Sequence, residues 1–114
     1  MHLSSLQVHG EAYGLCLEVC RFCANLEKTY KYSLGEQLRN TAFRLIVEID
    51  AAHIAESRRL LSEAQLCIRM LVDLNAMSHK RFLSFVEMTD KVSRQLMAWE
   101  RSKSTVTSAG VPMQ

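Results

Sequence analysis

The strongest constraint on the fold is a helical repeat of apolar residues that runs almost without interruption along the chain. In four successive stretches, apolar side chains recur at steps of three and four residues, which places them on one side of an α-helix. Helix breakers are scarce, because the chain holds four glycines and a single proline. No stretch shows the strict alternation of a half-buried β-strand. The sequence therefore predicts an all-α protein.

Short polar breaks divide the repeat into four helices of about 20 residues. The predicted helices cover residues 10–29, 33–55, 57–76 and 78–102. The predicted N-cap residues are Ser33, Ser57 and Ser78, and Ser33 with Glu36 has the spacing of a capping box. Because short connections favour antiparallel neighbours, we expect an antiparallel up-down-up-down four-helix bundle.

Length and composition indicate one domain of ordinary globular character. The chain has 114 residues, of which 48% are hydrophobic and 23% charged. The bundle is expected over residues 1–102, and residues 103–114, which lack a repeat, are expected to form a flexible C-terminal tail. No run approaches the roughly 20 apolar residues of a membrane span, and no signal peptide is recognisable. We therefore expect a cytoplasmic protein with reduced cysteines.

Catalytic motifs are absent from the sequence. There is no nucleophile elbow, no glycine-rich phosphate loop and no HExxH zinc motif, so neither enzymatic activity nor a cofactor is expected. One alternative is a metal or redox protein. It would use Cys16, Cys20, Cys23 and Cys67, or His53 together with Asp50. The competing interpretation is that the thiols fill a helix seam, because their spacing keeps them on an amphipathic helix.

Basic side chains are the remaining candidates for a functional surface, although the formal net charge is only +2. In an up-down bundle, one end gathers Lys28, Lys31, Lys80 and Arg81, with His79 nearby. The other end gathers Arg58, Arg59, Arg101 and Lys103, while Lys91 and Arg94 lie about one turn apart on the fourth helix. Such clusters can neutralise the phosphates of a nucleic acid, and a ring of subunits would add up their fields.

Several apolar residues lie partly off the main seams and are candidates for an oligomer interface. They are Leu61, Ile68, Val72, Met88 and Met97.

Motifs at three places in the chain together resemble one known family. Residues 28–38 read KTYKYSLGEQL, a basic-aromatic loop followed by a Ser-Leu-Gly helix start. Residues 55–61 and 73–78 and the segment Met97-Ala98-Trp99 continue the likeness, which covers roughly residues 10–102. In this order and spacing the chain resembles the Avd-like four-helix-bundle proteins, the accessory variability determinants of diversity-generating retroelements.

This resemblance implies a homopentameric barrel of four-helix bundles that is not itself catalytic. It implies binding of the element's reverse transcriptase and of RNA or cDNA, in support of mutagenic retrohoming. Two alternatives stay open at this point: a bundle protein of the type encoded in ribosomal RNA intervening sequences, and a structural bundle with a protein partner only.

Overall fold

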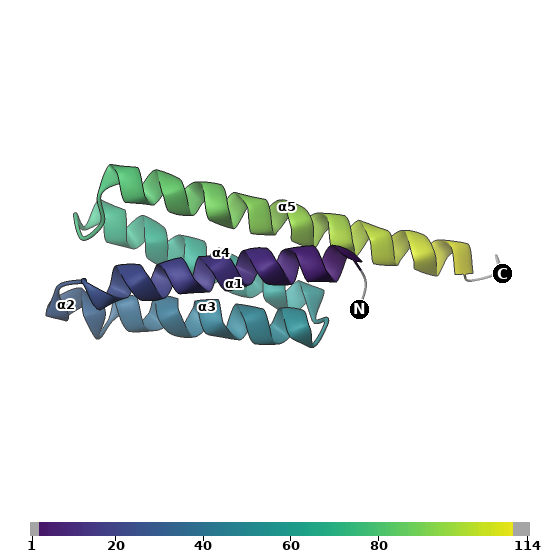
Figure 1. Cartoon of the computed structure of the whole chain (residues 1–114), viewed down its shortest axis with the longest axis horizontal. Coiled ribbons are helices and arrows are strands. Elements are labelled where there is room, and N and C mark those ends of the chain that lie inside the picture. Colours follow the sequence, from purple (N-terminus) through teal and green to yellow (C-terminus); the bar gives the residue numbers. More distant parts are fainter. Residues whose placement is uncertain (1–2, 111–114) are drawn as a thin grey trace.

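The computed structural model describes residues 3–110 of the chain, and side chains within residues 5–103. The described part consists of four long helices and a single helical turn, without any strand (Figure 1). Its elements are α1 (Leu3–Ala24), α2 (Lys28–Lys31), α3 (Leu34–Asp50), α4 (Ile54–Asp73) and α5 (His79–Gly110). The expectation of an all-helical bundle is confirmed.

Each long helix packs against two others. Helix α1 contacts α3 and α5, and α4 contacts the same two helices, so α1 and α4 lie diagonally across the bundle. Figure 1 shows α2 and the connection between α4 and α5 at one end of the bundle. The connection between α3 and α4 lies at the other end, and there α5 extends beyond the other helices.

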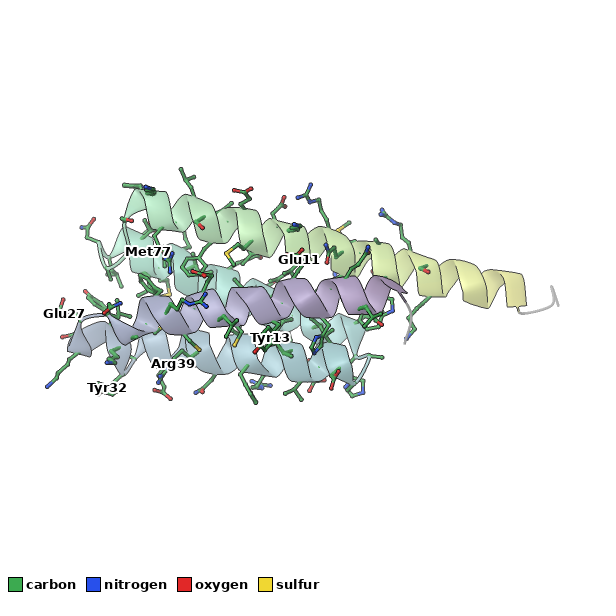
Figure 2. The ribbon with its side chains drawn as sticks, viewed as in Figure 1. Glu11, Tyr13, Glu27, Tyr32, Arg39 and Met77 are labelled. Atoms are coloured by element: carbon green, nitrogen blue, oxygen red, sulfur yellow. The ribbon has the colours of Figure 1, made fainter. Side chains whose placement is uncertain are left out.

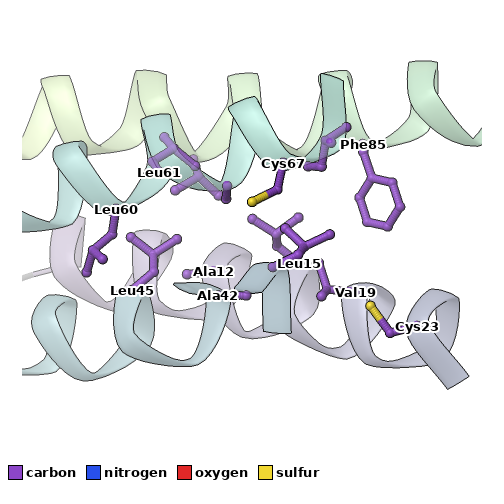
Figure 3. Close-up of a cluster of buried hydrophobic side chains, with 14 of the residues drawn as sticks. Ala12, Leu15, Val19, Cys23, Ala42, Leu45, Leu60, Leu61, Cys67 and Phe85 are labelled. Carbon is purple, nitrogen blue, oxygen red and sulfur yellow. The ribbon is translucent and has the colours of Figure 1, made fainter. Parts of the chain in front are cut away.

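The core follows the apolar seams of the four long helices. Val19 from α1, Leu45 from α3, Leu71 from α4 and Phe85 from α5 are all essentially inaccessible to solvent. Figure 3 shows side chains from all four helices meeting along the axis. Burial of one such leucine or phenylalanine contributes about 1.5–3 kcal/mol, so packing rather than intrinsic helix propensity holds these helices together.

The boundaries of the first predicted helix are wrong. Helix α1 begins at Leu3 rather than residue 10, because Val8 is fully buried and the early glycines are tolerated inside the helix. It ends at Ala24, after which the chain turns so that Leu26 enters the core. Residues 28–31 then form the separate turn α2.

The predicted capping hydrogen bonds of two serines are also wrong, although Ser33 does occupy the N-cap position of α3. The hydroxyl of Ser33 caps no amide of α3 and instead donates a 2.7 Å hydrogen bond back to the Thr29 carbonyl. Ser57 lies inside α4, fully buried, and donates to the carbonyl of His53. Only Ser78 behaves as predicted, because its hydroxyl accepts a hydrogen bond from the amide of Arg81 in the first turn of α5.

Helices α3 and α4 end in the same kind of backbone turn, and each ends earlier than predicted. After α3, the amide of His53 bonds the Glu48 carbonyl and the amide of Ala52 bonds that of Ile49. The positive φ of 61° at Ala52 completes a Schellman motif. Asn75, also at 61°, plays the same part after α4. Neither site carries glycine, the residue that signals such an ending in a sequence.

Three of the five residues proposed for an oligomer interface belong to the core of the single chain. Leu61, Ile68 and Val72 are only 3%, 2% and 7% exposed, because the buried side of α4 is wide enough to contact both α3 and α5. Met88 is half-buried against the core, and Met97 alone is substantially exposed. The interface prediction from Leu61, Ile68 and Val72 is therefore wrong.

The C-terminal helix is longer than predicted. Helix α5 continues through residues 103–110, which the sequence placed in a flexible tail. No helix breaker occurs before Gly110, so the chain has no local reason to stop at residue 102. The rest of the predicted tail, residues 111–114, lies outside the described residues.

Gly35 is required by a close approach of α3 to the preceding turn. A Cβ at this position would lie 2.9 Å from Leu26 Cδ2 and 3.0 Å from the Tyr30 carbonyl oxygen, whereas a Cβ at Gly14 would meet nothing within 4 Å. We expect Gly35→Ala to lower the free energy of unfolding by about 1–3 kcal/mol. Gly14→Ala should raise it by about 0.5–1 kcal/mol. Urea unfolding measures both, and equal effects would contradict the packing described here.

Candidate nucleic-acid interface

One end of the bundle brings two connections together around an open groove. Asn25, Leu26 and Glu27 line one side, and the α4–α5 connection from Asn75 to Ser78 lines the other, in a groove of about 540 Å³. Figure 2 shows Glu27, Tyr32 and Met77 at this end. The predicted placement of these two connections at the same end of the bundle is thereby confirmed.

Three lysines at this end carry charge that no carboxylate neutralises within the described part of the chain. Lys28 and Lys80 are exposed and form no ion pair, and Lys31 Nζ donates only to the Ala24 carbonyl, at 3.4 Å. Glu27, also exposed, is the acidic neighbour in α2's cap position. We call Lys28, Lys31 and Lys80, which lie at the same end of the bundle, the lysine cluster; their unpaired ammonium groups can attract an anion.

An exposed aromatic ring accompanies the lysine cluster. Tyr32 follows α2 directly and is 69% exposed. Its ring therefore offers a flat surface on which an unpaired base can stack, the usual companion of phosphate contacts in single-strand binding. Sequence reasoning listed only cations here and missed Tyr32 as a site residue, although the alternation of lysine and tyrosine in residues 28–32 was the available signal.

Arg81 lies at the same end, but its guanidinium makes contacts with other side chains of the bundle. Its guanidinium pairs with Glu18 at 3.2 Å and lies over the Phe85 ring, 5.2 Å from the centroid. Phe22 meets the same ring edge-on, with centroids 5.9 Å apart. Arg21 binds the same Glu18 carboxylate. The side chain of Arg81 therefore connects α5 to α1. The sequence did not predict this contact, because Glu18 and Arg81 are 63 residues apart in the chain.

The second predicted basic cluster is largely neutralised by carboxylates. Arg58 pairs with Glu100 at 2.8 Å, which does bring the start of α4 beside the later part of α5. Hydrogen bonds from Arg59 to Glu56 first, and to Glu63 second, raise the pKa of Arg59. Lys103 Nζ lies 5.7 Å from the centre of the Trp99 ring. Arg101 is exposed and forms no ion pair with the described side chains.

The remaining two predicted cations, Lys91 and Arg94, also pair with carboxylates. Lys91 Nζ lies 3.2 Å from Glu11 on α1, and Arg94 lies 3.4 Å from Asp90 one turn earlier on α5. These groups are exposed pairs of modest strength, and each cation is partly screened from an incoming phosphate by its partner. The structure therefore separates the ten predicted cations into the lysine cluster with Arg101 and a larger set held in contacts of the fold.

The cysteines do not assemble into a metal centre. Cys16 is half-buried, Cys20 is exposed, and Cys23 and Cys67 lie in the core. His53 contacts Glu48 at 2.7 Å, beside the connection to α4. Among the described residues, no group of three or more histidine, cysteine or acidic side chains is placed to hold a metal ion.

Burial governs the chemistry of the thiols. Desolvation, reinforced by the neighbouring Cys20, raises the pKa of Cys16 to about 11. Desolvation also raises the pKa of Cys23 to about 11, against an opposing effect of Arg39, and it raises that of Cys67. These three thiols stay protonated at neutral pH and are poor nucleophiles and poor metal ligands.

Comparison with known proteins adds no relative to this picture. No protein-family model, no curated protein and no solved structure matches the chain. Within the described residues, no helix is both long enough and apolar enough to cross a membrane.

Thiol labelling provides a test of the buried cysteines. In the folded protein at pH 8, we expect Cys16, Cys23 and Cys67 to resist iodoacetamide, and urea to release them for modification. Folding raises the pKa of Cys16 and Cys23 from the ordinary value of 9.0 to about 11. The contribution of these two thiols to the free energy of unfolding is therefore fully present below pH 9, and it is lost as the pH rises toward 11. Mass spectrometry of the labelled peptides checks the first expectation. Rapid modification of Cys23 in the native state would contradict it.

Proposed function

We propose that this chain is a non-catalytic accessory protein of a diversity-generating retroelement. In this role it binds the element's reverse transcriptase together with RNA or cDNA and supports mutagenic retrohoming. The family resemblance of residues 10–102 suggests this role, and the helical bundle is compatible with it. The observation that carries the nucleic-acid part is the lysine cluster, which keeps its charge while nine of the fourteen basic side chains pair with carboxylates.

The chemistry of binding is electrostatic attraction combined with stacking. Lysine ammonium groups at the bundle end displace the counterions of a phosphate backbone, which gives affinity without reading the sequence. Tyr32 adds a surface for an unpaired base, so the site favours single-stranded RNA or cDNA over a duplex. Polar groups of the adjoining groove, including Asn25 and Asn75, are available for further hydrogen bonds.

The assembly proposed with this function is a homopentamer of antiparallel up-down-up-down bundles. The described part of one copy presents only three unpaired lysines at this end, which is a weak polyanion site for a chain of net charge +2. Cyclic symmetry would present the lysine cluster and Tyr32 five times on one side of the assembly. The ring acts as a scaffold that holds polymerase and template together, and the chemistry is left to the polymerase.

A charge-matched comparison tests the lysine cluster. We expect the triple variant Lys28→Gln, Lys31→Gln, Lys80→Gln to weaken RNA binding and to reduce the slope of log affinity against log salt by about 2. The control Arg44→Gln, Arg69→Gln, Arg94→Gln removes the same charge from side chains already paired with carboxylates. Fluorescence anisotropy with a labelled single-stranded RNA measures both. Equal losses of RNA affinity in the two variants would contradict the assignment of the lysine cluster as the RNA-binding site.

Substitution of the aromatic ring separates stacking from charge. Tyr32→Ala should weaken binding of single-stranded RNA by about 1–3 kcal/mol and leave the salt slope unchanged, because no ammonium group is lost. Tyr32→Phe is the matched control and should bind normally. An equal loss for Tyr32→Phe would indicate that the hydroxyl, rather than the ring face, makes the contact.

The partner is identified by recovery from the native host. A tagged full-length chain is purified with and without nuclease, and co-purified proteins and RNA are sequenced. Recovery of a reverse transcriptase with its template RNA supports the proposal. Ribosomal RNA and ribosomal proteins would favour the intervening-sequence alternative, and a protein partner without RNA would favour a structural bundle.

A further inference from the structure

Helix α1 carries a second apolar seam on its outside. The residues Leu6, Gly10, Tyr13, Leu17, Cys20 and Ala24 follow one another at steps of 4, 3, 4, 3 and 4, the spacing of a helix-packing seam. We call these six residues the α1 strip. All are exposed, with Leu6 and Tyr13 each 53% accessible, and none is charged. Helices that are apolar on both sides are normally covered on both sides.

The charges of α1 lie away from this strip. Glu11 and Glu18 face α5, where they pair with Lys91 and Arg81. The opposite side of α1 faces α3, where the Cys23 thiol donates a 3.5 Å hydrogen bond to the Gly35 carbonyl, and Cys20 lies about one turn before Cys23. The α1 strip therefore points outward and toward the α3 side of the bundle. Figure 2 shows Tyr13 on this face, with Arg39 on neighbouring α3.

Gly10 leaves room for a neighbouring helix to approach the α1 strip closely. A Cβ at Gly10 would meet nothing within 4 Å, so nothing in the chain itself requires glycine there. A glycine inside a helix is otherwise unfavourable relative to alanine. Close approach of a second backbone is the physical circumstance in which a glycine on an outer helix face improves packing.

A second exposed apolar strip lies on α4. Leu66, Met70 and Leu74 recur at steps of four and are 59%, 42% and 46% exposed; we call them the α4 strip. Met70 lies seven residues after Glu63, and Glu63 contacts Thr41 of α3 at 3.2 Å, so this strip also lies toward α3. The two strips belong to helices on opposite corners of the bundle, and both turn toward the same third helix.

We propose that a second copy of this chain covers the α1 strip with its α4 strip, and that this contact joins successive subunits head to tail. The inference rests on the self-association included in the proposed function and names the surfaces that perform it. Tyr13, Leu17 and Cys20 of one copy pack on Leu66, Met70 and Leu74 of the next. Each chain carries one strip of each kind, so every subunit has two neighbours.

Charge at the edges of the strips favours this pairing. Arg21 lies one turn beyond Leu17 and pairs with Glu18, yet its side chain stays 63% exposed. Asp73 lies between Met70 and Leu74, pairs with Arg69 and is equally exposed. Both α1 and α4 reach their C-terminal ends at the α2 end of the bundle, where their following residues line one groove. With the helices side by side, Arg21 of one copy meets the aspartate at position 73 of the next.

The inclination of the two strips favours a ring of subunits. A head-to-tail contact generates a ring when the rotation between successive subunits closes, and an open helical filament when it does not. Both strips lean toward α3, so successive copies rotate in the same sense. Because the contact keeps the α2 ends on one side, the lysine clusters of all subunits gather on one rim of the ring.

Disulfide trapping in the full-length protein tests the contact. Met70→Cys places a thiol on the α4 strip opposite the native Cys20 of the neighbouring copy, and mild oxidation should give a ladder of covalent species extending beyond the dimer. Cys20→Ser in the same background should abolish the ladder. The matched control Leu83→Cys carries a thiol on α5, away from both strips, and should give no ladder. A product that stops at the dimer, or absence of cross-linking, overturns the head-to-tail contact.

Mass measurements give a second, independent readout. Light scattering should find the wild-type chain as a multiple of 13.0 kDa, and Leu17→Glu or Leu66→Glu as a helical monomer of 13.0 kDa. The control Leu83→Glu, at a site 64% exposed on α5, should keep the wild-type mass. Circular dichroism verifies that the variants are folded. A monomeric wild type, or loss of assembly in the control alone, overturns the proposal.

A charge exchange tests the edge contact. Arg21→Asp and Asp73→Arg should each weaken association, and the double variant should restore it. Restored assembly with no binding of RNA would leave the contact intact and refute only the nucleic-acid function. RNA binding by a monomer that fails every assembly test would refute the subunit contact and leave the nucleic-acid function intact.

Discussion

The rest of this structure depends on the burial of one continuous apolar seam shared by four helices. None of the helices is a stable unit alone, because each has only a stripe of apolar residues to hide from water. Once the seams of the four helices, with buried side chains such as Leu45, Leu71 and Phe85, share one core, the directions of the helices and the places of their connections are fixed. The surfaces on which function depends follow from that arrangement, since the bundle ends are where the connections meet.

Ion pairs then decide which surface charges are available. Arg58 and Arg81 are held by carboxylates from other helices, and so contribute to the fold as much as to the external field. The lysine cluster has no such partners among the described side chains and therefore keeps its attraction for phosphate. A modest net charge is compatible with a polyanion surface when the unpaired cations lie at one end and symmetry repeats that end.

Two kinds of error in the sequence reading share one cause. The hydroxyls of Ser33 and Ser57 were predicted to cap a helix, because serine before an apolar repeat is the local signal for a cap. Both hydroxyls instead donate hydrogen bonds to preceding carbonyls. Leu61, Ile68 and Val72 looked surplus to a single seam, yet α4 lies between two helices and buries a wide face. Local patterns do not report how many neighbours a helix will have.

The sequence by itself determined the helical class, the number of long helices and the apolar residues that fill most of the core. Spacing along one chain is enough for these, because an α-helix converts a period of 3.6 residues into a face. Tertiary structure alone decided which cations remain unpaired, that the thiols of Cys16 and Cys23 are desolvated, and that α1 carries a second, outward strip. These properties depend on distances between residues such as Glu18 and Arg81, which are far apart in the chain and meet only when the helices pack.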